Sequence, residues 1–192
     1  RGGTLNLFLN TTEGVMANQT FRQAALAALN CDDIMLAAYG NPDLYELSAS
    51  WSDPTDVQWG TDAGSEYYNQ HDTEKAKELL KEAGYNNEKI VLVTTQDYPE
   101  MYNATLVVQE QLKQAGINAE VETYDFSTFM EHRSAASDEE AAAAWEKLQK
   151  FLYEYSAATV LGHYTGVTAM SNDVAGYDYL RFPIYWNVTV AE

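Results

Sequence analysis

The residues able to do chemistry are few, and their spacing favours binding over catalysis. The histidines, His71, His132 and His163, stand apart, and none lies at metal-ligand spacing from a cysteine or a carboxylate. The single cysteine, Cys31, adjoins two aspartates, whose charges raise a thiol's pKa and oppose a nucleophilic role. A Gly-x-Ser-x-Gly elbow, a phosphate loop and a His-Glu-x-x-His motif are all missing. We therefore predict no catalytic residue, no metal site and no cofactor.

Aromatic side chains supply better candidates for a binding site. Tyr98, Met101 and Tyr102 follow a short apolar run that is typical of a buried strand. Open α/β sheets bind ligands beyond the carboxyl ends of their strands, where aromatic rings offer a large contact area with a polar tip. Trp51, in the long irregular stretch 41–70, is a fourth candidate. The alternative for each is that the side chain covers a small core within its own loop.

The stretch DTEKAKELLKEAGY, residues 72–85, combines the signals of a helix with those of its two ends. Asp72 is placed to accept from the N–H groups of the first turn, and its charge suits the positive end of the helix dipole. Leu79 and Leu80 fall on one apolar stripe, so both are predicted core residues. Gly84 supplies a left-handed stop, and the apolar run KIVLV that follows is typical of a buried strand.

The remaining periodicity predicts that helices and strands alternate. We expect strands near 4–9, 89–94, 117–123, 157–163, 167–170 and 184–190, and helices near 19–38, 73–83, 101–115, 126–132 and 138–154. Such alternation predicts an α/β fold, and the strand–helix–strand steps between 90 and 121 imply parallel neighbours. The expected architecture is a single three-layer-like lobe with a mixed, largely parallel sheet flanked by helices, to which the later strands could add antiparallel partners.

Charge and length narrow the classes of partner. A net charge of −18 repels phosphate backbones and anionic lipid, so nucleic acid and membrane surfaces are disfavoured partners. One cysteine permits no disulfide within the chain, which fits either a reducing compartment or an exported bacterial protein without bridges. The 192 residues can bury a core as one domain or as two small ones.

Three stretches resemble the family 5 extracellular solute-binding proteins and follow one another in the order of the family's pattern. Proteins of this family are the receptors of ABC importers for peptides, nickel and sugars. FRQAALAALNCDDIMLAAYG, residues 21–40, is similar to the family's VRQAL..AID...I.....G helix. Asn30 stands where the family usually has Asp. The positions in register are Arg22, Gln23, Ala24, Ile34 and Gly40. The second stretch is DTEKAKELLKEAGY with its strand, and the third is VVQEQLKQAGINAEV, residues 107–121.

The resemblance implies a fold, a function and partners. Residues 1–192 correspond to the C-terminal lobe of a two-lobed, periplasmic-binding-protein-like receptor of class II. Such a lobe is non-catalytic and holds a peptide or similar small solute together with the N-terminal lobe of the same parent chain. The parent would carry an export signal, work in the periplasm or anchored to the cell surface by lipid, and deliver its solute to the membrane permease of an ABC transporter.

The sequence departs from the family pattern at one place. Between FMEHR, residues 129–133, and SDEEAAAAW, residues 137–145, the family normally has a few dozen further residues, and in relatives that segment carries several solute contacts. Here only 134–136 bridge the two sides. A lobe with this shorter connection is expected to hold a reduced solute site.

Two other function classes remain open from the residues alone. The chain could be a small acidic α/β enzyme such as a hydrolase, against which the missing nucleophile–base motif counts. It could also be an interaction domain whose long aromatic loop meets a protein partner. The resemblance favours the solute receptor, but peptide, nickel-complex and oligosaccharide receptors share these scaffold motifs, so the solute itself stays open.

Overall fold

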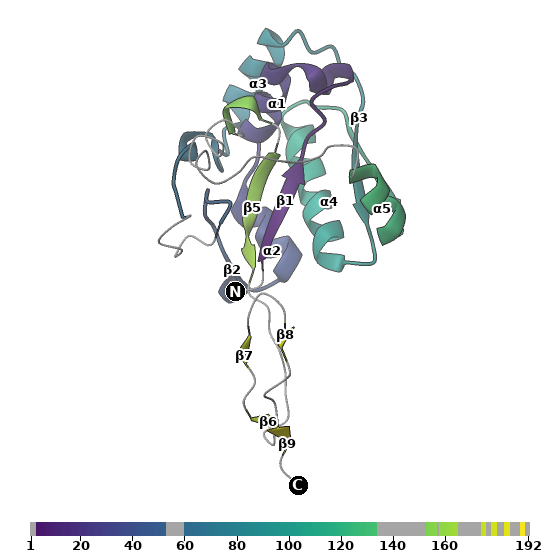
Figure 1. Ribbon diagram of the computed structural model, residues 1–192. Coiled ribbons are helices and arrows are strands. Elements are labelled where there is room, and N and C mark those ends of the chain that lie inside the picture. The colour runs from purple at the N-terminus through teal and green to yellow at the C-terminus, as the bar shows by residue number, and fades with distance from the viewer. Residues whose placement is uncertain are drawn as a thin grey trace.

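The computed structural model describes residues 3–52, 60–133, 153–156 and 158–164, together with four two-residue strands nearer the C-terminus (Figure 1). The longer strands are β1 (Gly3–Phe8), β3 (Ile90–Thr95), β4 (Ala119–Tyr124) and β5 (Ala158–Tyr164). The two-residue strands are β2 (Tyr45–Glu46), β6 (Val174–Ala175), β7 (Asp178–Tyr179), β8 (Pro183–Ile184) and β9 (Thr189–Val190). The helices are α1 (Gln19–Ala27), α2 (Cys31–Tyr39), α3 (Thr73–Glu82), α4 (Pro99–Gln114) and α5 (Phe126–Arg133), and the 3₁₀ turns are η1 (Gly14–Ala17), η2 (Pro42–Leu44) and η3 (Ser65–Tyr67).

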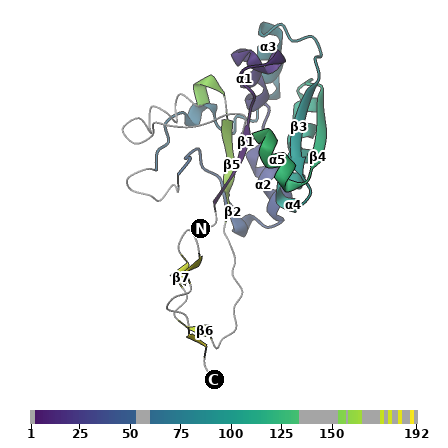
Figure 2. The ribbon, with the colours of Figure 1, turned by 45° about the vertical axis from the view of Figure 1, so that its right-hand side comes forward.

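Two separate sheets lie on one layer of helices (Figures 1 and 2). The first has the order β1-β5-β2 and is antiparallel throughout. The second contains β3 and β4, which run parallel from the pair Ile90 and Ala119 to the pair Thr95 and Tyr124. Helix α2 packs on β5, α4 packs on β3 and β4, and the two helices pack on each other. The short strands β6 with β9, and β7 with β8, form antiparallel pairs.

The α/β class is confirmed, but the expectation of one largely parallel sheet is wrong in its detail. Among the described strands only β3 and β4 are parallel neighbours, because only they are joined by a crossover helix, α4. Strand β5 returns beside β1 from far along the chain and runs against it. Local periodicity reports where a strand lies but not which distant strand it meets, so it could not reveal this pairing.

The single helix expected over 19–38 is two helices, and Asn30 is the reason. Its side-chain oxygen accepts from the N–H groups of Asp32 (3.0 Å) and Asp33 (3.4 Å) and so begins α2. Asparagine is among the strongest N-cap residues because its short side chain competes for backbone N–H groups. The same residue is tied to α4, since its N–H donates to Gln111 Oε1 (2.9 Å) and its carbonyl accepts from Gln111 Nε2 (3.3 Å).

The ends of α3 and α4 follow the predicted signals. Asp72 accepts from the N–H of Lys75 (2.9 Å), and Gly84, with φ of 69°, ends α3. Gly116, with φ of 95°, ends α4 in the same way. In both helices the residue after the glycine donates to the carbonyl five positions back, which is the Schellman pattern. Among the described residues no helix is both long and apolar enough to cross a membrane.

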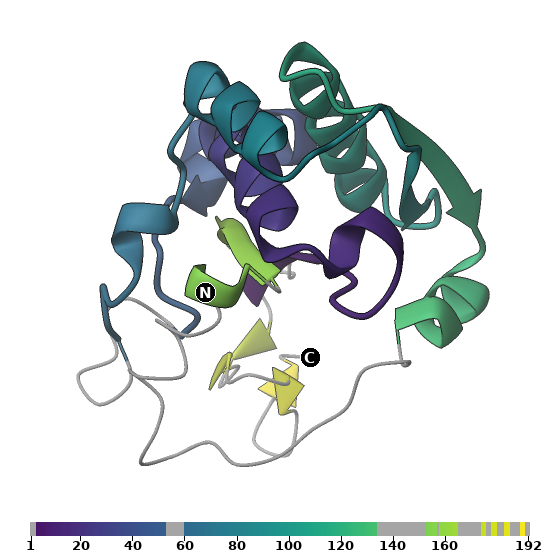
Figure 3. The same cartoon turned by 90° about the horizontal axis from the view of Figure 1, so that it is seen from above.

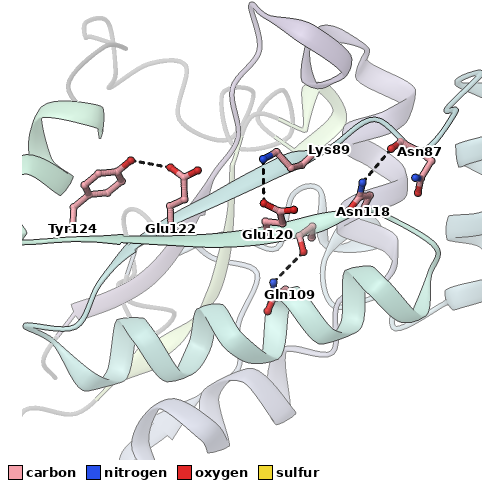
Figure 4. A network of polar contacts seen from close by, with 8 residues as sticks. Asn87, Lys89, Gln109, Asn118, Glu120, Glu122 and Tyr124 are labelled. Atoms are coloured by element: carbon pink, nitrogen blue, oxygen red, sulfur yellow. Dashed lines mark hydrogen bonds and ion pairs between the residues drawn. The ribbon is translucent and has the colours of Figure 1, made fainter.

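Polar contacts fasten β3, β4 and α4 into one unit (Figure 4). Lys89 and Glu120 form an ion pair across the two strands (3.1 Å), and Gln109 Nε2 donates to the carbonyl of Ala119 (3.0 Å). Asn118 Nδ2 donates to the carbonyl of Asn87 (3.2 Å). The ion pair is exposed and therefore weak, but the amide contacts fix the turn from α4 into β4.

The core lies between the helices and the inner faces of both sheets. Its fully buried members come from α1, α2, α4 and the strand starts, and include Phe21, Ile34, Met35, Val108 and Ile117. Leu80 is buried as predicted, whereas Leu79 is only partly buried and packs at the margin. The expectation that both leucines are core residues is therefore correct for one of them.

The guanidinium of Arg22 is buried and joins two distant segments through their carbonyl groups. Nη1 donates to the carbonyls of Met16 (2.8 Å) and Ala17 (3.1 Å). Nη2 donates to the carbonyl of Tyr155 (2.6 Å). Nε donates to the carbonyls of Tyr155 (3.1 Å) and Ser156 (3.0 Å). The group also lies 4.5 Å from the centre of the Tyr155 ring. A fork of fixed donors suits this task, because each of the three guanidinium nitrogens finds a carbonyl acceptor.

Several expected elements lie wholly or partly outside the described residues. Of the helix expected over 138–154, the described residues 153–154 are helical. The strand expected at 157–163 is confirmed as β5, while the strand expected at 167–170 cannot be compared. Only the ends of the stretch 184–190 are described, as parts of β8 and β9.

Leu80→Ala is expected to lower the free energy of unfolding by about 2–5 kcal/mol, because it removes buried methyl groups and leaves a cavity. Asp72→Ala should cost about 1 kcal/mol through loss of the α3 cap. Denaturant titration measures both, and Leu79→Ala, at a half-exposed position of the same helix, is the matched control with a smaller loss. A loss below about half a kcal/mol at Leu80 would contradict this packing.

Arg22→Met should cost at least about 3 kcal/mol, because buried carbonyl groups of both segments lose their donors. Gln23→Ala, which removes a single bond to the carbonyl of Glu154 (3.0 Å), should cost only about 1 kcal/mol. Urea unfolding of the two variants in parallel makes the comparison. Equal losses in both would show that Arg22 does not join the segments as described.

Candidate functional site

The carboxyl end of β3 runs into a short loop that presents Tyr98. Thr95 is buried, and its hydroxyl accepts from the N–H of Asp97 (3.2 Å), which turns the chain away from the sheet. Helix α4 begins at Pro99, whose missing N–H costs nothing in a first turn. Tyr98 is therefore held at the junction of strand and helix, with 42% of its surface exposed.

Tyr98 is part of an aromatic cluster formed with Phe126 and Phe129 of α5. The rings of Tyr98 and Phe126 meet edge to face with centroids 4.7 Å apart, and those of Phe126 and Phe129 are 6.1 Å apart. Asp97 Oδ2 accepts from the N–H of Phe126 (2.8 Å), which fastens the start of α5 to the loop after β3. Phe126 is 36% exposed. The cluster thus offers exposed ring surface at the carboxyl ends of both parallel strands.

The sequence analysis missed Phe126 and Phe129, although a signal was available. Strands β3 and β4 are joined by a helix and were expected to be parallel, so their carboxyl ends had to meet at one edge. Thr95, at the end of β3, is indeed paired with Tyr124, two residues before Phe126. The residues that follow β4 should therefore have been weighed together with those that follow β3.

The structure brings together three of the four candidate binding residues. Met101 and Tyr102 lie in the first turn of α4, directly after Tyr98, and both are half-buried. Trp51 belongs to a different region: its ring meets that of Tyr153 edge to face at 6.5 Å. Tyr153 is fully buried and donates to the carbonyl of Ala49 (3.0 Å), so Trp51 packs beside a buried ring from outside its own loop.

The edge around the aromatic cluster is acidic. Asp125 accepts from Ser127 and Thr128 at the start of α5, and these hydrogen bonds lower the pKa of Asp125 to about 2. Tyr124 donates to Glu122 (2.8 Å), which raises the pKa of the tyrosine. The sequence has no lysine or arginine from 90 to 112 or from 114 to 132. Such a margin favours a neutral or positively charged group beside the rings.

A second feature is an open hollow of about 530 Å³ within the long loop region. Its wall carries several hydroxyl groups and one carboxylate, and the lining residues are Leu47, Ser48, Ala49, Ser50, Gly60, Thr61, Asp62, Ser65 and Tyr68. Ser50 is buried, and its carbonyl lies 2.8 Å from His163 Nε2. The hollow is separate in sequence from the aromatic cluster and contains none of the predicted binding residues.

The described residues show structural roles for Cys31 and for His163. His163, in β5, is buried against the carbonyl of Ser50. Cys31 is buried at the start of α2, and burial raises the pKa of its thiol to about 12, despite a hydrogen bond with Tyr68 that lowers it. The pKa of the thiol is raised, as expected. The main cause is desolvation by burial, whereas the neighbouring carboxylates were expected to raise it. No group of three potential metal ligands occurs in the part of the chain that the structure describes.

Comparison with solved structures shows the fold. The oligopeptide-binding protein AppA of Bacillus subtilis, in complex with a nonapeptide, matches with a TM-score of 0.77 at 18% identity. The match covers 98% of this chain and 51% of AppA. The dipeptide-binding protein of Pseudoalteromonas sp. SM9913, in complex with Met-Leu, matches with a TM-score of 0.72 at 20% identity, covering 100% of this chain and 49% of that one.

Comparison of sequences shows the family. The model of the bacterial extracellular solute-binding proteins, family 5 Middle, matches residues 1–169. A curated relative, named "Probable peptide ABC transporter periplasmic-binding protein y4tO" of Sinorhizobium fredii, is 31% identical over 179 residues. That alignment covers 93% of this chain but 33% of the relative, so the chain spans about a third of the relative's length. By the family model and by this relative, the chain belongs to family 5 of the bacterial extracellular solute-binding proteins.

Proposed function

We propose that this chain is the C-terminal lobe of an extracytoplasmic peptide receptor that serves an ABC importer. The family supports a solute receptor. The names of the curated relative and of both solved structures mention peptides, which favours a peptide as the solute over a nickel complex or a sugar. In this proposal the lobe binds without catalysis. Its partners are the peptide, a second lobe in the same parent chain and the membrane permease.

The observation that carries the proposal is the exposed aromatic cluster at the carboxyl ends of β3 and β4. Rings of this kind contact apolar side chains of many shapes, because they supply area without demanding one hydrogen-bond pattern. The carboxylates around them suit the ammonium group of a peptide. Tyr98 is the first contact residue, and Met101 and Tyr102 support it from the first turn of α4.

Trp51 is the weakest of the proposed contacts. Its neighbour Tyr153 explains its position without a ligand. It could reach a solute only from the long loop region, which faces the first sheet. We keep it in the proposed site as the residue whose substitution should matter least.

One lobe supplies part of a site that a receptor closes between two lobes. A complete site buries most of its ligand, and a single lobe cannot do so. The short connection between Arg133 and Asp138 reduces the available surface further. The affinity of this chain alone should therefore be low, on the order of millimolar, near −4 kcal/mol.

Calorimetry of the isolated chain against mixed peptides, nickel complexes and oligosaccharides should give no dissociation constant of about a micromolar or tighter. A dissociation constant in that range for any of these solutes would contradict the proposal that this chain holds only half of a binding site. Weak binding is followed by amide NMR titration with the dipeptide Met-Leu. We expect shift changes at 96–102 and 125–129, lost in Tyr98→Ala.

Tyr67→Ala is the matched control for that titration, because Tyr67 is a half-buried tyrosine of η3 outside the proposed site. It should leave the Met-Leu shifts unchanged. Shift changes that persist in Tyr98→Ala, or that centre on the hollow near Ser50 and Thr61, would place the peptide elsewhere.

A further inference from the structure

Residues 68–71 lie against the junction between α1 and α2 in a backbone conformation that is unusual for residues with a side chain. Asn69 and His71 both have φ of 47°, in the left-handed region. The Cβ atom makes this region costly, although Asn and His are among the residues that adopt it most often. We call residues 68–71 the strap. A strained segment of this kind persists only where the surrounding contacts hold it.

The strap is bonded to the backbone on both sides of the helix junction. Asn69 Oδ1 accepts from the N–H of Cys31 (2.7 Å), the first residue of α2. The N–H of His71 donates to the carbonyl of Leu29 (3.1 Å), just after the end of α1. Groups at helix ends have no partner within their own helix. The strap therefore satisfies backbone groups that neither helix can satisfy by itself.

The chain on the far side of the strap is fixed independently. The N–H of Asp72 donates to the carbonyl of Ala27 (2.8 Å), and the carboxylate of Asp72 caps α3. Helix α3 in turn packs along α1. Figure 3 shows this part of the molecule from above, with the chain passing from η3 into α3. The strap can thus leave the helix junction without displacing α3, if the backbone turns between His71 and Asp72.

The contacts that hold the strap are mostly polar. Tyr68, Asn69 and Gln70 are partly exposed, and His71 is exposed. Only Tyr68 packs against the main core, and its hydroxyl lies 3.5 Å from the carbonyl of Leu161, which is a long hydrogen bond. Segments with few buried apolar groups are the ones that open locally before a domain unfolds. A strained backbone and a small apolar contact together make the strap such a segment.

The strap covers a buried side chain and part of a wall. Cys31 is only 1% exposed, and its thiol has a hydrogen bond with Tyr68. Tyr68 also lines the open hollow near Ser50 and Thr61. Movement of the strap would therefore uncover the thiol and change the wall of the hollow at the same time.

We propose that the strap opens as a unit about Asp72 while α1, α2 and α3 stay folded. Release relieves the left-handed conformation of Asn69 and His71, and the hydrogen bonds to Cys31 and Leu29 oppose it. The open form withdraws Tyr68 from the hollow. The strap is thus a conformational device in the lobe, and it does not depend on the solute proposed above.

Alkylation of Cys31 by iodoacetamide, followed by mass spectrometry of the whole chain, reports the opening, because Cys31 is the single cysteine. A local opening exposes little surface, so the rate of alkylation should rise only weakly with urea. Near the unfolding transition, global unfolding should take over with a steep dependence on urea. A rate of alkylation that follows global unfolding at every urea concentration would overturn the proposal.

Amide hydrogen exchange tests whether the strap moves as a unit. The N–H groups of Cys31 and His71 should exchange with equal protection. The N–H of Ile34, bonded to the carbonyl of Asn30 (3.3 Å), and the N–H of Asp72 should be protected more strongly. Exchange of Ile34 together with Cys31 would mean that α2 frays instead. Alkylation of the thiol while both strap amides stay protected would place the opening elsewhere, and either result overturns the proposal.

Substitutions at two left-handed positions give a matched comparison. His71→Val puts a β-branched residue in the left-handed region and should speed alkylation at low urea by about tenfold. His71→Asn, which tolerates this region, should restore the rate of the unsubstituted chain. Asn87→Val introduces the same strain at φ of 63° in the loop between α3 and β3, and should lower stability without speeding alkylation at low urea.

Equal acceleration by His71→Val and Asn87→Val would show that alkylation follows overall stability, and would overturn the proposal. If His71→Val does not fold, the urea dependence and the exchange pattern of the unsubstituted chain decide alone.

Discussion

The architecture depends on a buried guanidinium that binds backbone carbonyl groups. Arg22, on α1, joins the turn η1 that precedes it to the carbonyl groups that end a helical turn just before β5. Gln19 and Gln23, on the same helix, add donors to the carbonyl of Glu154 (2.7 and 3.0 Å). Carbonyls at the end of a helical turn have no partner within it and carry partial negative charge, so a cation with several donors suits them. This places β5 beside β1 and so creates the first sheet.

The second constraint is the contact between α2 and α4, on which both sheets lie. Gln111 bonds to both backbone groups of Asn30, at the break between α1 and α2, and so sets α4 against that break. On the other side of α2 the approach to β5 is close, since a Cβ at Gly162 would lie 2.6 Å from Met35 Cε. The position of α4 in turn decides where β3 ends and where Tyr98 is presented. The aromatic cluster is therefore positioned by packing several turns away from it.

The fold and the proposed function meet at the carboxyl ends of β3 and β4. The parallel pair brings two loops together, and each contributes aromatic rings, so the surface depends on the crossover and not on either loop alone. Asp97 links the loops by accepting from the N–H of Phe126. The match to the family model covers residues 1–169, which include both loops. That surface is half of a cleft in the proposal made here, which explains why it is open.

Local signals determined α3, α4 and their ends, because caps at Asp72 and stops at Gly84 and Gly116 act within a few residues. They also placed Tyr98 after the end of a buried strand, as a candidate binding residue. Only the tertiary structure decided that β5 runs against β1, that Trp51 packs on Tyr153, and that Phe126 joins Tyr98. These contacts join residues far apart in sequence, where periodicity carries no information about partners. The split of one expected helix into α1 and α2 depends on both local and tertiary contacts. Asn30 is a capping residue that the sequence shows, but its hydrogen bonds to Gln111 form only when the helices pack.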